Sequence, residues 1–461
     1  MDKPSLPSGT RDFGPEVMMR RKYIIGIVEE TFKRFGFLPL ETPALENLRT
    51  LQGKYGEEGD QLLFKILNNG DFLAKTDEHL LQLRDSKAIT PQISDRGLRY
   101  DLTVPLARFV VMNRDKIYFP FKRYQIQPVW RADRPQKGRY REFWQCDADM
   151  VGSQGVSNEA DLLQIYDAAF AKLNLKVNIR FNHRGILDAF SPWLEGAANH
   201  GRFMQLIDKA DKIGFEGVMN EIISHDIPNG AEAWSLLHHI SCMGTTEEKL
   251  HALETAEPIQ HETLHKGIAE IRQLLKLLKN ISCTNSMTLD VTLARGLSYY
   301  TGMVMEVVPA DDRIPGDFRI GSIGGGGRYD NLTGVFGLKD VTGVGISFGL
   351  DRIYDLMDVA GIFPEETLQT TAVLFCCMDE NAMPTAFALA TNLRNAGIAT
   401  EVYPGAAKLK KQLDYANHKG IQWACILGEQ EIQDGTVSVK NMNSGEQHTI
   451  AQNHILEQIA L

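Results

Sequence analysis

The chain of 461 residues lacks any cysteine pattern that predicts a metal site or a disulfide framework. Its six cysteines include no CxxC pair, the spacing that supplies many structural zinc sites. No stretch approaches the ~18 apolar residues of a membrane span, and the first residues hold no apolar targeting segment. These absences predict a cytoplasmic protein that binds no structural metal and has no membrane partner.

Basic residues are also fewer than acidic residues. The 49 lysine and arginine residues stand against 59 aspartate and glutamate residues, which gives a formal net charge of −10. An acidic total does not indicate nucleic acid, so any RNA contact requires a local basic surface. The GxxxxGK[ST] phosphate loop is missing, and Gly343-x-Gly345 falls short of a GxGxxG motif. Neither familiar nucleotide-binding loop is therefore predicted.

Ample apolar material remains for large cores. Hydrophobic residues make up 43% of the chain, whose length suits about three domains. Residues 15–35 are predicted to form an amphipathic helix, with Pro15 suited to its start and Gly36 to its stop. Residues 37–43 contain two prolines and are predicted to form an edge or interface strand. The alternative is an edge strand that has no partner.

The pattern changes along the middle of the chain. Residues 98–180 favour strands and turns, whereas residues 186–286 are mostly helical and are interpreted as an inserted domain. Strand-like, glycine-rich sequence resumes at Met287 and continues to Gly349. A predicted helix over residues 350–359 closes this part.

The last part of the chain, residues 371–461, alternates between strands and helices. Three predicted strands, of which the first is a buried-strand run, are separated by two predicted helices, in the order 372–377, 381–396, 398–403, 409–419 and 423–427. This βαβαβ alternation predicts a small α/β domain with a parallel sheet.

The most informative segment runs from Val129 to Asp149. Two runs rich in aromatic and β-forming residues flank a turn with Pro135 and Gly138, which predicts a β-hairpin. Residues two apart in a strand share a face. The first arm is then expected to present Arg131 and Asp133, and the second arm Arg141, Phe143, Gln145, Asp147 and Asp149.

One face of this hairpin thus runs from guanidinium groups through an aromatic ring to an amide and two carboxylates. That order suits a ligand with a phosphate end, a stackable base and a cationic end, because the arginine fork matches phosphate oxygens. The hairpin therefore predicts a nucleotide-using enzyme. The alternative is a solvated two-stranded ribbon whose charges pair among themselves.

The turn of the hairpin carries a dense group of cations, Arg134, Lys137, Arg139 and Arg141. This density predicts contact with RNA phosphates, since each neutralised phosphate also releases counterions. The alternative is a charged loop tip that only keeps the protein soluble.

Residues 134–141, Arg-Pro-Gln-Lys-Gly-Arg-Tyr-Arg, closely resemble the second signature motif of class II aminoacyl-tRNA synthetases, in the form of the histidyl-tRNA synthetase family. The helix at residues 15–35 and the strand before Pro43 resemble the first motif, and residues 343–352 resemble the third. Residues 99–105 and 294–302 resemble two segments that are more specific for the histidine family. The resemblance covers nearly the whole chain and is weakest over the helical insertion.

The resemblance implies an α+β catalytic domain on an antiparallel sheet of the class II synthetase type. Residues 1–185 would form its first part with motifs 1 and 2, and residues 186–286 a helical insertion domain. Residues 287–363 would form its second part with the histidine motif and motif 3. Residues 371–461 would form a C-terminal α/β anticodon-binding-type domain. The first motif also implies a homodimer.

The implied reaction is ATP-dependent activation of histidine to histidyl-adenylate, followed by transfer to the 3′ end of tRNA(His). ATP and Mg²⁺ are the expected cofactors, with the ion held largely by the nucleotide. The resemblance places Arg131 and Arg295 at the α-phosphate, from opposite sides, as catalytic residues. Arg139 would reach the outer phosphates, and Phe143 and Arg352 would stack on the two faces of the adenine.

Histidine would be bound by residues from several motifs. Asp101 and Thr103, predicted to share a strand face, resemble the ammonium contacts of the family and are joined by Gln145. Asp149 and Tyr300 resemble the groups that bind the imidazole, since a carboxylate and a phenol suit a ring that both donates and accepts.

Three more residues are implied by position in the motifs. Tyr299 would line the histidine pocket beside its neighbour in the same turn. Arg134 and Gln136 would contact the acceptor end of the tRNA.

Two other interpretations stay open at this point. One is a non-catalytic, synthetase-like regulatory subunit of histidine biosynthesis, which would be expected to lack the ATP-handling arginines and the C-terminal domain. The other is a class II synthetase with another amino-acid specificity, such as threonine or proline. Those enzymes lack the Arg-Gly-Leu-x-Tyr-Tyr segment, and a threonine enzyme would be expected to use zinc, for which no ligands are evident.

Overall fold

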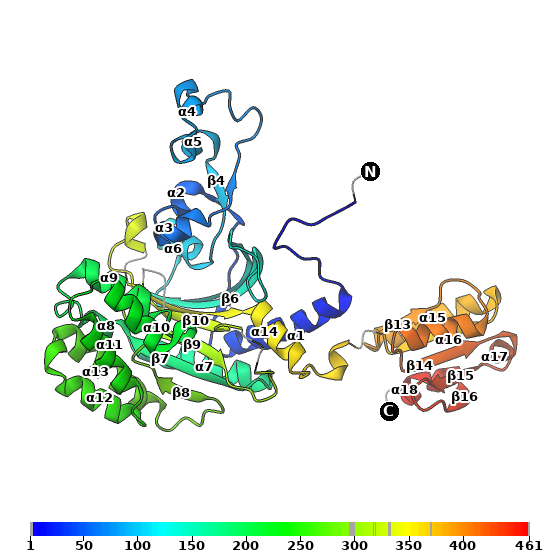
Figure 1. The fold of residues 1–461 in the computed structure, drawn as a ribbon. Helices are drawn as coiled ribbons and strands as arrows, with labels where there is room; N and C mark the ends of the chain where they lie inside the picture. The colour runs from blue at the N-terminus through cyan, green and yellow to red at the C-terminus, as the bar shows by residue number, and fades with distance from the viewer. Residues whose placement is uncertain are drawn as a thin grey trace. The chain divides into compact units, whose positions relative to one another are not determined.

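A computed structural model describes residues 3–294, 300–316, 318, 320–330, 333–368 and 371–459. The chain divides into two compact units, Met1–Ile362 and Phe363–Leu461. Figure 1 shows that each unit is built around a sheet of its own.

The first unit is built on an eight-stranded sheet with the order β1-β5-β6-β11-β10-β9-β7-β8. Its strands are β1 (Leu38–Pro39), β5 (Phe121–Trp130), β6 (Glu142–Val151), β11 (Gly343–Gly349), β10 (Gly324–Arg328), β9 (Met303–Pro309), β7 (Val177–His183) and β8 (Ser286–Leu289). The central pairs are antiparallel, while β1–β5 and β7–β8, at the two ends, are parallel. The predicted antiparallel α+β class is therefore confirmed.

Aromatic side chains join two helices to this sheet. The ring of Phe348 on β11 lies 5.8 Å from Phe32, 4.8 Å from Tyr166 and 5.4 Å from Phe170, centroid to centroid. These partners lie on α1 (Pro15–Arg34) and α7 (Ser157–Lys172), and α14 (Leu350–Val359) follows β11 directly. The helices predicted at residues 15–35 and 350–359 are confirmed, and the first stops where Gly36 adopts a φ of 79°. β1 is an edge strand of the sheet, as predicted.

The expectation of a strand-rich segment over residues 98–180 is wrong for two stretches, which form α6 (Thr103–Met112) and α7. Valines in the run from Val104 to Val110 favour a strand by themselves. Burial of both valines in a helix decides otherwise. Val104 packs into a core with Leu51 and Tyr100, and Val110 packs into a separate core with Val151. Thr103 therefore begins a helix.

A smaller three-stranded sheet of order β2-β4-β3 lies ahead of α6 in the sequence. Its strands are β2 (Leu45–Asn47), β4 (Arg96–Leu98) and β3 (Lys65–Ile66). Four short helices accompany it: α2 (Leu48–Leu51), α3 (Gly56–Gln61), α4 (Glu78–Leu83) and α5 (Ser86–Ile93). Figure 1 shows α4 and α5 projecting beyond this sheet.

The stretch between β7 and β8 is helical. It comprises α8 (Arg184–Asp188), α9 (Ala197–Ile207), α10 (Ala210–Ser224), α11 (Gly230–Ser241), α12 (Thr246–Thr255) and α13 (Glu262–Leu278). These helices gather beside the β7–β8 end of the large sheet, in green in Figure 1. The domain boundaries drawn around them stay a prediction.

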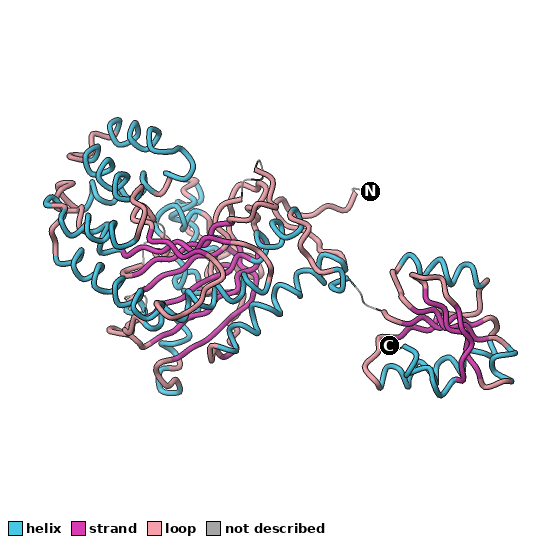
Figure 2. Tube along the Cα trace, turned by 90° about the horizontal axis from the view of Figure 1, so that it is seen from below, coloured by secondary structure: helices cyan, strands magenta, loops and turns pink. Residues whose placement is uncertain are grey.

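The second unit holds a five-stranded sheet of order β13-β12-β14-β15-β16. Its strands are β13 (Thr400–Val402), β12 (Val373–Cys377), β14 (Trp423–Leu427), β15 (Thr436–Asn441) and β16 (Gln447–Ala451). Its helices are α15 (Met383–Asn395), α16 (Leu409–His418), α17 (Glu429–Gln433) and α18 (Ile455–Ile459). Figure 2 shows the strands lying between helices, and alternate residues of β12 enter separate cores on the two faces.

The predicted parallel sheet holds for β13, β12 and β14 only. β15 and β16 form an antiparallel ribbon that extends the sheet and was not predicted. Within the described part of the chain, no helix is long and apolar enough to cross a membrane.

Candidate active site

A cleft of about 1130 Å³ opens in the first unit, where β6, β10 and β11 meet the loop between β5 and β6. Phe143, Gln145, Asp147 and Asp149 of β6 line it, as does Trp144, whereas Cys146 and Ala148 are buried outside it. The predicted face of the second hairpin arm is thereby confirmed from residue 143 to residue 149. Arg141 does not line the cleft.

The cleft brings together most of the residues predicted from the sequence. Those that line it are Asp101, Thr103, Arg131, Arg139, Phe143, Gln145, Asp149, Tyr300 and Arg352. Arg134 and Gln136 are exposed on the loop outside the cleft. Arg295 and Tyr299 lie outside the described residues.

The hairpin differs in one respect from its prediction. β5 ends at Trp130, so Arg131 and Asp133 belong to the connecting loop and not to the first arm. Within this loop Gln136 and Arg139 form an isolated bridge, and Gly138 makes the tight turn with a φ of 72°.

Arg131 enters the cleft from this loop in a fixed orientation. Its Nε donates a hydrogen bond to the carbonyl oxygen of Tyr100 at 3.1 Å. The guanidinium carbon lies 4.2 Å from the ring centroid of Tyr100 and 5.1 Å from that of Phe143. A planar cation held in this way can present its remaining N–H groups to an anion.

Two more arginines reach the cleft near Arg131. Arg352 donates from Nε to the carbonyl oxygen of Gly138 at 2.9 Å and from Nη1 to that of Ser322 at 2.7 Å. Arg139 is half-exposed, and its Nε lies 3.4 Å from Asp133 Oδ1. The arginines of the hairpin loop and of α14 therefore converge on one cleft.

A buried carboxylate, Asp351, joins three parts of this region. It forms ion pairs with Arg11 and with Arg21 of α1, the latter at 2.7 Å. Its Oδ2 accepts a hydrogen bond from the backbone N–H of Trp144 in β6 at 2.9 Å. The residue preceding Arg352 is therefore fixed by α1, by β6 and by the segment ahead of α1.

That N-terminal segment also holds the hairpin loop from outside. The guanidinium of Arg11 lies 3.2 Å from the centroid of the Tyr140 ring. The backbone N–H of Arg141 donates to the carbonyl oxygen of Gly9 at 2.9 Å, and Arg141 Nη1 donates to that of Ser8 at 3.3 Å.

Asp149 is held from two sides at the base of the cleft. Arg123 Nη2, directly across the β5–β6 pair, lies 2.8 Å from Asp149 Oδ2, and Tyr329 donates its hydroxyl to Oδ1 at 2.6 Å. Burial raises the pKa of Asp149, against the opposing effect of Arg123. A Cβ at Gly345 would lie 2.0 Å from Asp149 Oδ1, so glycine is required there.

Asp147 supplies a second buried carboxylate on the same face. Burial raises the pKa of Asp147 to about 7, opposed chiefly by Arg123 and helped by Asp149. Asp147 Oδ1 and Gln145 Oε1 are buried and accept no hydrogen bond within the described part of the chain. Because unsatisfied buried acceptors are costly, both atoms are suited to receive donors from a ligand.

Asp101 lies in the turn that precedes α6, and the prediction that it shares a strand face with Thr103 is wrong. Its Oδ1 accepts from the backbone N–H of Val104 at 3.1 Å and from the hydroxyl of Tyr55 at 3.0 Å. Burial raises the pKa of Asp101, opposed by the Val104 N–H and by Arg131. Both Asp101 and Thr103 still line the cleft, because the start of a helix turns them toward it.

The site thus offers several arginines and several buried carboxylates within one cleft, among them Asp101, Asp147 and Asp149, together with an amide and tyrosine hydroxyls. Such a set can bind a ligand with both anionic and cationic groups. The described residues contain no group of histidine, cysteine or acidic side chains placed to hold a metal ion. Sequence patterns did not indicate Arg123, Tyr55, the hydrogen bond of Tyr329 to Asp149 or the part played by Asp351.

Comparison with known proteins gives matches over the whole chain. The family model of histidyl-tRNA synthetase matches residues 71–353, and that of the anticodon binding domain matches residues 370–460. The chain is 47% identical over 456 residues to a histidine–tRNA ligase of Phocaeicola vulgatus, with 98% of each chain covered. It is 47% identical over 461 residues to that of Cytophaga hutchinsonii, with 100% of each covered. The crystal structure of histidyl-tRNA synthetase from Nostoc sp. PCC 7120 is 28% identical, with a TM-score of 0.81 over 100% of this chain and 99% of that one.

Proposed function

Since the chain belongs to the histidyl-tRNA synthetase family, we propose that the cleft on its eight-stranded sheet binds ATP and histidine together. The chain activates histidine with ATP to histidyl-adenylate and transfers the histidyl group to the 3′ end of tRNA(His). Its C-terminal unit matches the anticodon binding domain, which the regulatory alternative was expected to lack. The observation that carries the proposed site is one cleft that combines converging arginines with buried carboxylates.

In the first step a carboxylate oxygen of histidine bonds to the α-phosphorus of ATP, and the bond to the bridging oxygen breaks, so pyrophosphate leaves. Both reactants are anionic, so alignment and positive charge carry most of the catalysis. We assign Arg131 to the α-phosphate, because its orientation is already set by the Tyr100 carbonyl. Arg295 is proposed for the opposite side of the same phosphate.

The remaining ATP contacts are assigned around Arg131. Phe143 and Arg352 line the cleft and are proposed to stack on the two faces of the adenine. Arg139 is proposed for the outer phosphates, since its long contact to Asp133 is easily exchanged for a triphosphate oxygen.

Histidine is proposed to lie against the carboxylates. Asp101, Thr103 and Gln145 would hold the α-ammonium, and the unsatisfied Oε1 of Gln145 supports this role. We add Asp147 to this set, because its free Oδ1 is a buried acceptor in the same cleft.

The imidazole is assigned to a second group of residues. Asp149 and Tyr300 are proposed as its hydrogen-bonding partners, with Tyr299 beside them. The hold of Arg123 and Tyr329 on Asp149 supports this assignment, because a fixed carboxylate selects ring nitrogens by position.

Mg²⁺ is proposed as the companion of ATP. The donor set of the described residues fits no ion held mainly by protein. It does fit an ion carried mainly by the phosphates, since Arg131 and Arg139 line the cleft where the phosphates are proposed to bind. Bound in this way, Mg²⁺ would neutralise charge on the departing pyrophosphate.

The partners beyond the small substrates are tRNA and a second subunit. Arg134 and Gln136 are proposed to meet the acceptor end of the tRNA, because both are exposed on the loop beside the cleft. A homodimer is proposed along β1, an edge strand whose Leu38 is 62% exposed. The protein is proposed to act in the cytoplasm, where tRNA is charged.

Amino-acid-dependent ATP–pyrophosphate exchange tests the proposed site most directly. The twenty amino acids are compared with the wild-type protein, and exchange is expected with histidine alone. The same assay with Asp149→Asn is expected to lose the response to histidine at low concentration. Exchange that is equal in the variant and the wild type would remove Asp149 from the site.

A further inference from the structure

Residues 300–302, just ahead of β9, and residues 327–330, at the end of β10, interlock beside the cleft. The ring of Tyr300 lies over Gly327, where an added Cβ would be 2.9 Å from Tyr300 Cδ1 and 2.7 Å from the carbonyl oxygen of Met303. The side chain of Arg328 lies over Gly302, where an added Cβ would be 2.9 Å from Arg328 Cδ. Each glycine thus admits a side chain from the other segment, so neither segment can shift alone.

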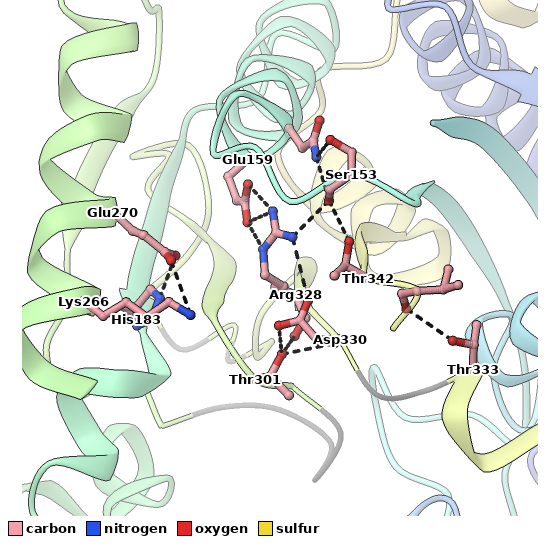
Figure 3. Close-up of polar contacts among 12 residues, drawn as sticks. Ser153, Glu159, His183, Lys266, Glu270, Thr301, Arg328, Asp330, Thr333 and Thr342 are labelled. Atoms are coloured by element: carbon pink, nitrogen blue, oxygen red, sulfur yellow. Dashed lines mark hydrogen bonds and ion pairs between the residues drawn. The ribbon is translucent and has the colours of Figure 1, made fainter. Parts of the chain in front are cut away.

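Hydrogen bonds join the same two segments at Thr301. Its backbone N–H donates to the carbonyl oxygen of Arg328 at 2.8 Å. Its hydroxyl donates to Asp330 Oδ2 at 2.8 Å and accepts from the backbone N–H of Asp330 at 3.1 Å. Figure 3 shows Thr301, Arg328 and Asp330 as one connected group.

Arg328 is the member of this group that is fixed to the rest of the fold. Its side chain is 7% exposed and forms a bidentate ion pair with the buried Glu159 of α7. Nε donates to Glu159 Oε1 at 2.6 Å, and Nη2 donates to Oε2 at 2.8 Å. Its Nη1 also donates to the carbonyl oxygen of Ser153 at 3.2 Å. A planar guanidinium held at both edges has a fixed position, which a lysine in the same place would not have.

The other side of Gly302 is fixed as well. Its carbonyl oxygen accepts from the backbone N–H of Arg184 at 2.8 Å. The preceding residue, His183, pairs through Nε2 with Glu270 of α13 at 3.0 Å, as Figure 3 shows. Residues 300–302 are therefore clamped between the Arg328 side chain and the start of the helical stretch.

We propose that Arg328 and Glu159 are positioning residues for histidine recognition, which act by setting the place of Tyr300 through the interlock at Gly302 and Thr301. Arg328 does not line the cleft, whereas Tyr300 and Tyr329 on either side of the interlock do. The pair therefore controls the substrate through geometry and not through contact. The proposal rests on the proposed role of Tyr300 in binding the imidazole.

The test compares the KM values for histidine and for ATP in pyrophosphate exchange. Arg328→Lys keeps the charge and loses the fork, and Glu159→Gln keeps the shape and loses the charge. Both are expected to raise the KM for histidine by roughly ten- to a hundred-fold, since displacement of a positioned group by about 1 Å costs that much. The KM for ATP is expected to stay near its wild-type value. An equal change in both KM values, or none in that for histidine, would overturn the proposal.

A third variant keeps the test decisive where a buried ion-pair variant fails to fold. Thr301→Val retains the shape of the side chain, leaves the Arg328–Glu159 ion pair in place and removes both hydrogen bonds of the hydroxyl to Asp330. It is expected to raise the KM for histidine selectively, though less than Arg328→Lys. A wild-type KM in a folded Thr301→Val protein would show that the interlock does not place Tyr300.

Two further variants separate the possible failures. Arg180→Lys alters another mostly buried arginine, which pairs with Asp290 and Glu306 and does not line the cleft. It is expected to lower the melting temperature without raising the KM for histidine. Tyr300→Phe is expected to raise that KM. If it does and the Arg328 variants do not, the positioning role is refuted while the site stands. If Tyr300→Phe has no effect, the Tyr300 assignment fails, and the positioning role fails with it.

Discussion

Gly345→Ala adds a single methyl group at the point where β11 faces Asp149. The two residues are directly opposed in the β6–β11 pair. The new Cβ would lie 2.0 Å from Asp149 Oδ1, whereas ordinary contact begins at 3.4 Å. The carboxylate would therefore have to move by roughly 1.4 Å. It cannot do so and keep both the Arg123 contact at 2.8 Å and the Tyr329 contact at 2.6 Å.

The expected consequence is a selective loss of histidine binding. Misplacement by about 1 Å can cost roughly a hundred-fold, which corresponds to about 2.7 kcal/mol. The KM for histidine in pyrophosphate exchange is therefore expected to rise by about two orders of magnitude, with little change in the KM for ATP. Crowding also destabilises a core by about 1–3 kcal/mol. The melting temperature is therefore measured first, and the kinetics are run well below it.

Gly201→Ala on α9 provides the control. It adds the same methyl group at a position outside the cleft lining that has no heavy atom within 4 Å of the new Cβ. This variant is expected to keep its affinity for histidine. If both variants leave the KM for histidine within about two-fold of the wild type, Asp149 is not the imidazole contact and the reasoning from its geometry is refuted.

Three further perturbations probe the rest of the site. Arg131→Ala should add about 2–4 kcal/mol to the activation barrier, and near-normal histidine-dependent pyrophosphate exchange would contradict its place at the α-phosphate. Arg134→Ala and Gln136→Ala should impair tRNA charging far more than adenylate formation; equal loss in both steps would mean that the loop only shapes the cleft. Burial raises the pKa of Asp147 to about 7, so affinity for histidine should fall as the pH drops through 7 and the carboxylate loses its charge. The Asp147→Asn variant should lack this fall in affinity. If its pH profile is the same as that of the wild type, Asp147 does not take part in binding. The same raised pKa should make the free energy of unfolding of the wild type decrease as the pH rises from the ordinary range of an aspartate to about 7, and this decrease should be smaller in Asp147→Asn.

Local patterns predicted the parts of the fold that depend on neighbours in the chain. The helix after Pro15, its end at Gly36 and the alternating side chains of β6 follow from spacing and turn chemistry. α6 was missed because its valines favour a strand, and only the distant partners that bury them reveal a helix. The β15–β16 ribbon was missed because the alternation that precedes it ends at β14.

For the site as well, the sequence predicted the residues of local motifs but not the contacts between distant positions. Motif resemblance identified the cleft residues on β6 and at the start of α14, since the residues of each motif lie close together in the sequence. The contacts that orient them join positions far apart, such as Tyr329 with Asp149 and Arg21 with Asp351. Arg123 could be found only from the register of β5 against β6, and that register depends on a loop whose length the sequence did not fix.

The segment ahead of α1 has a practical consequence for anyone who handles this protein. Ser8 and Gly9 hold the outside of the loop that is proposed to receive tRNA, and Arg11 shares Asp351 with the helix that carries Arg352. An affinity tag or a fused domain placed ahead of Ser8 would therefore disturb both the loop proposed to receive tRNA and the helix that carries Arg352. Low activity in such a fusion protein would then be an effect of the attachment point and not a property of the enzyme.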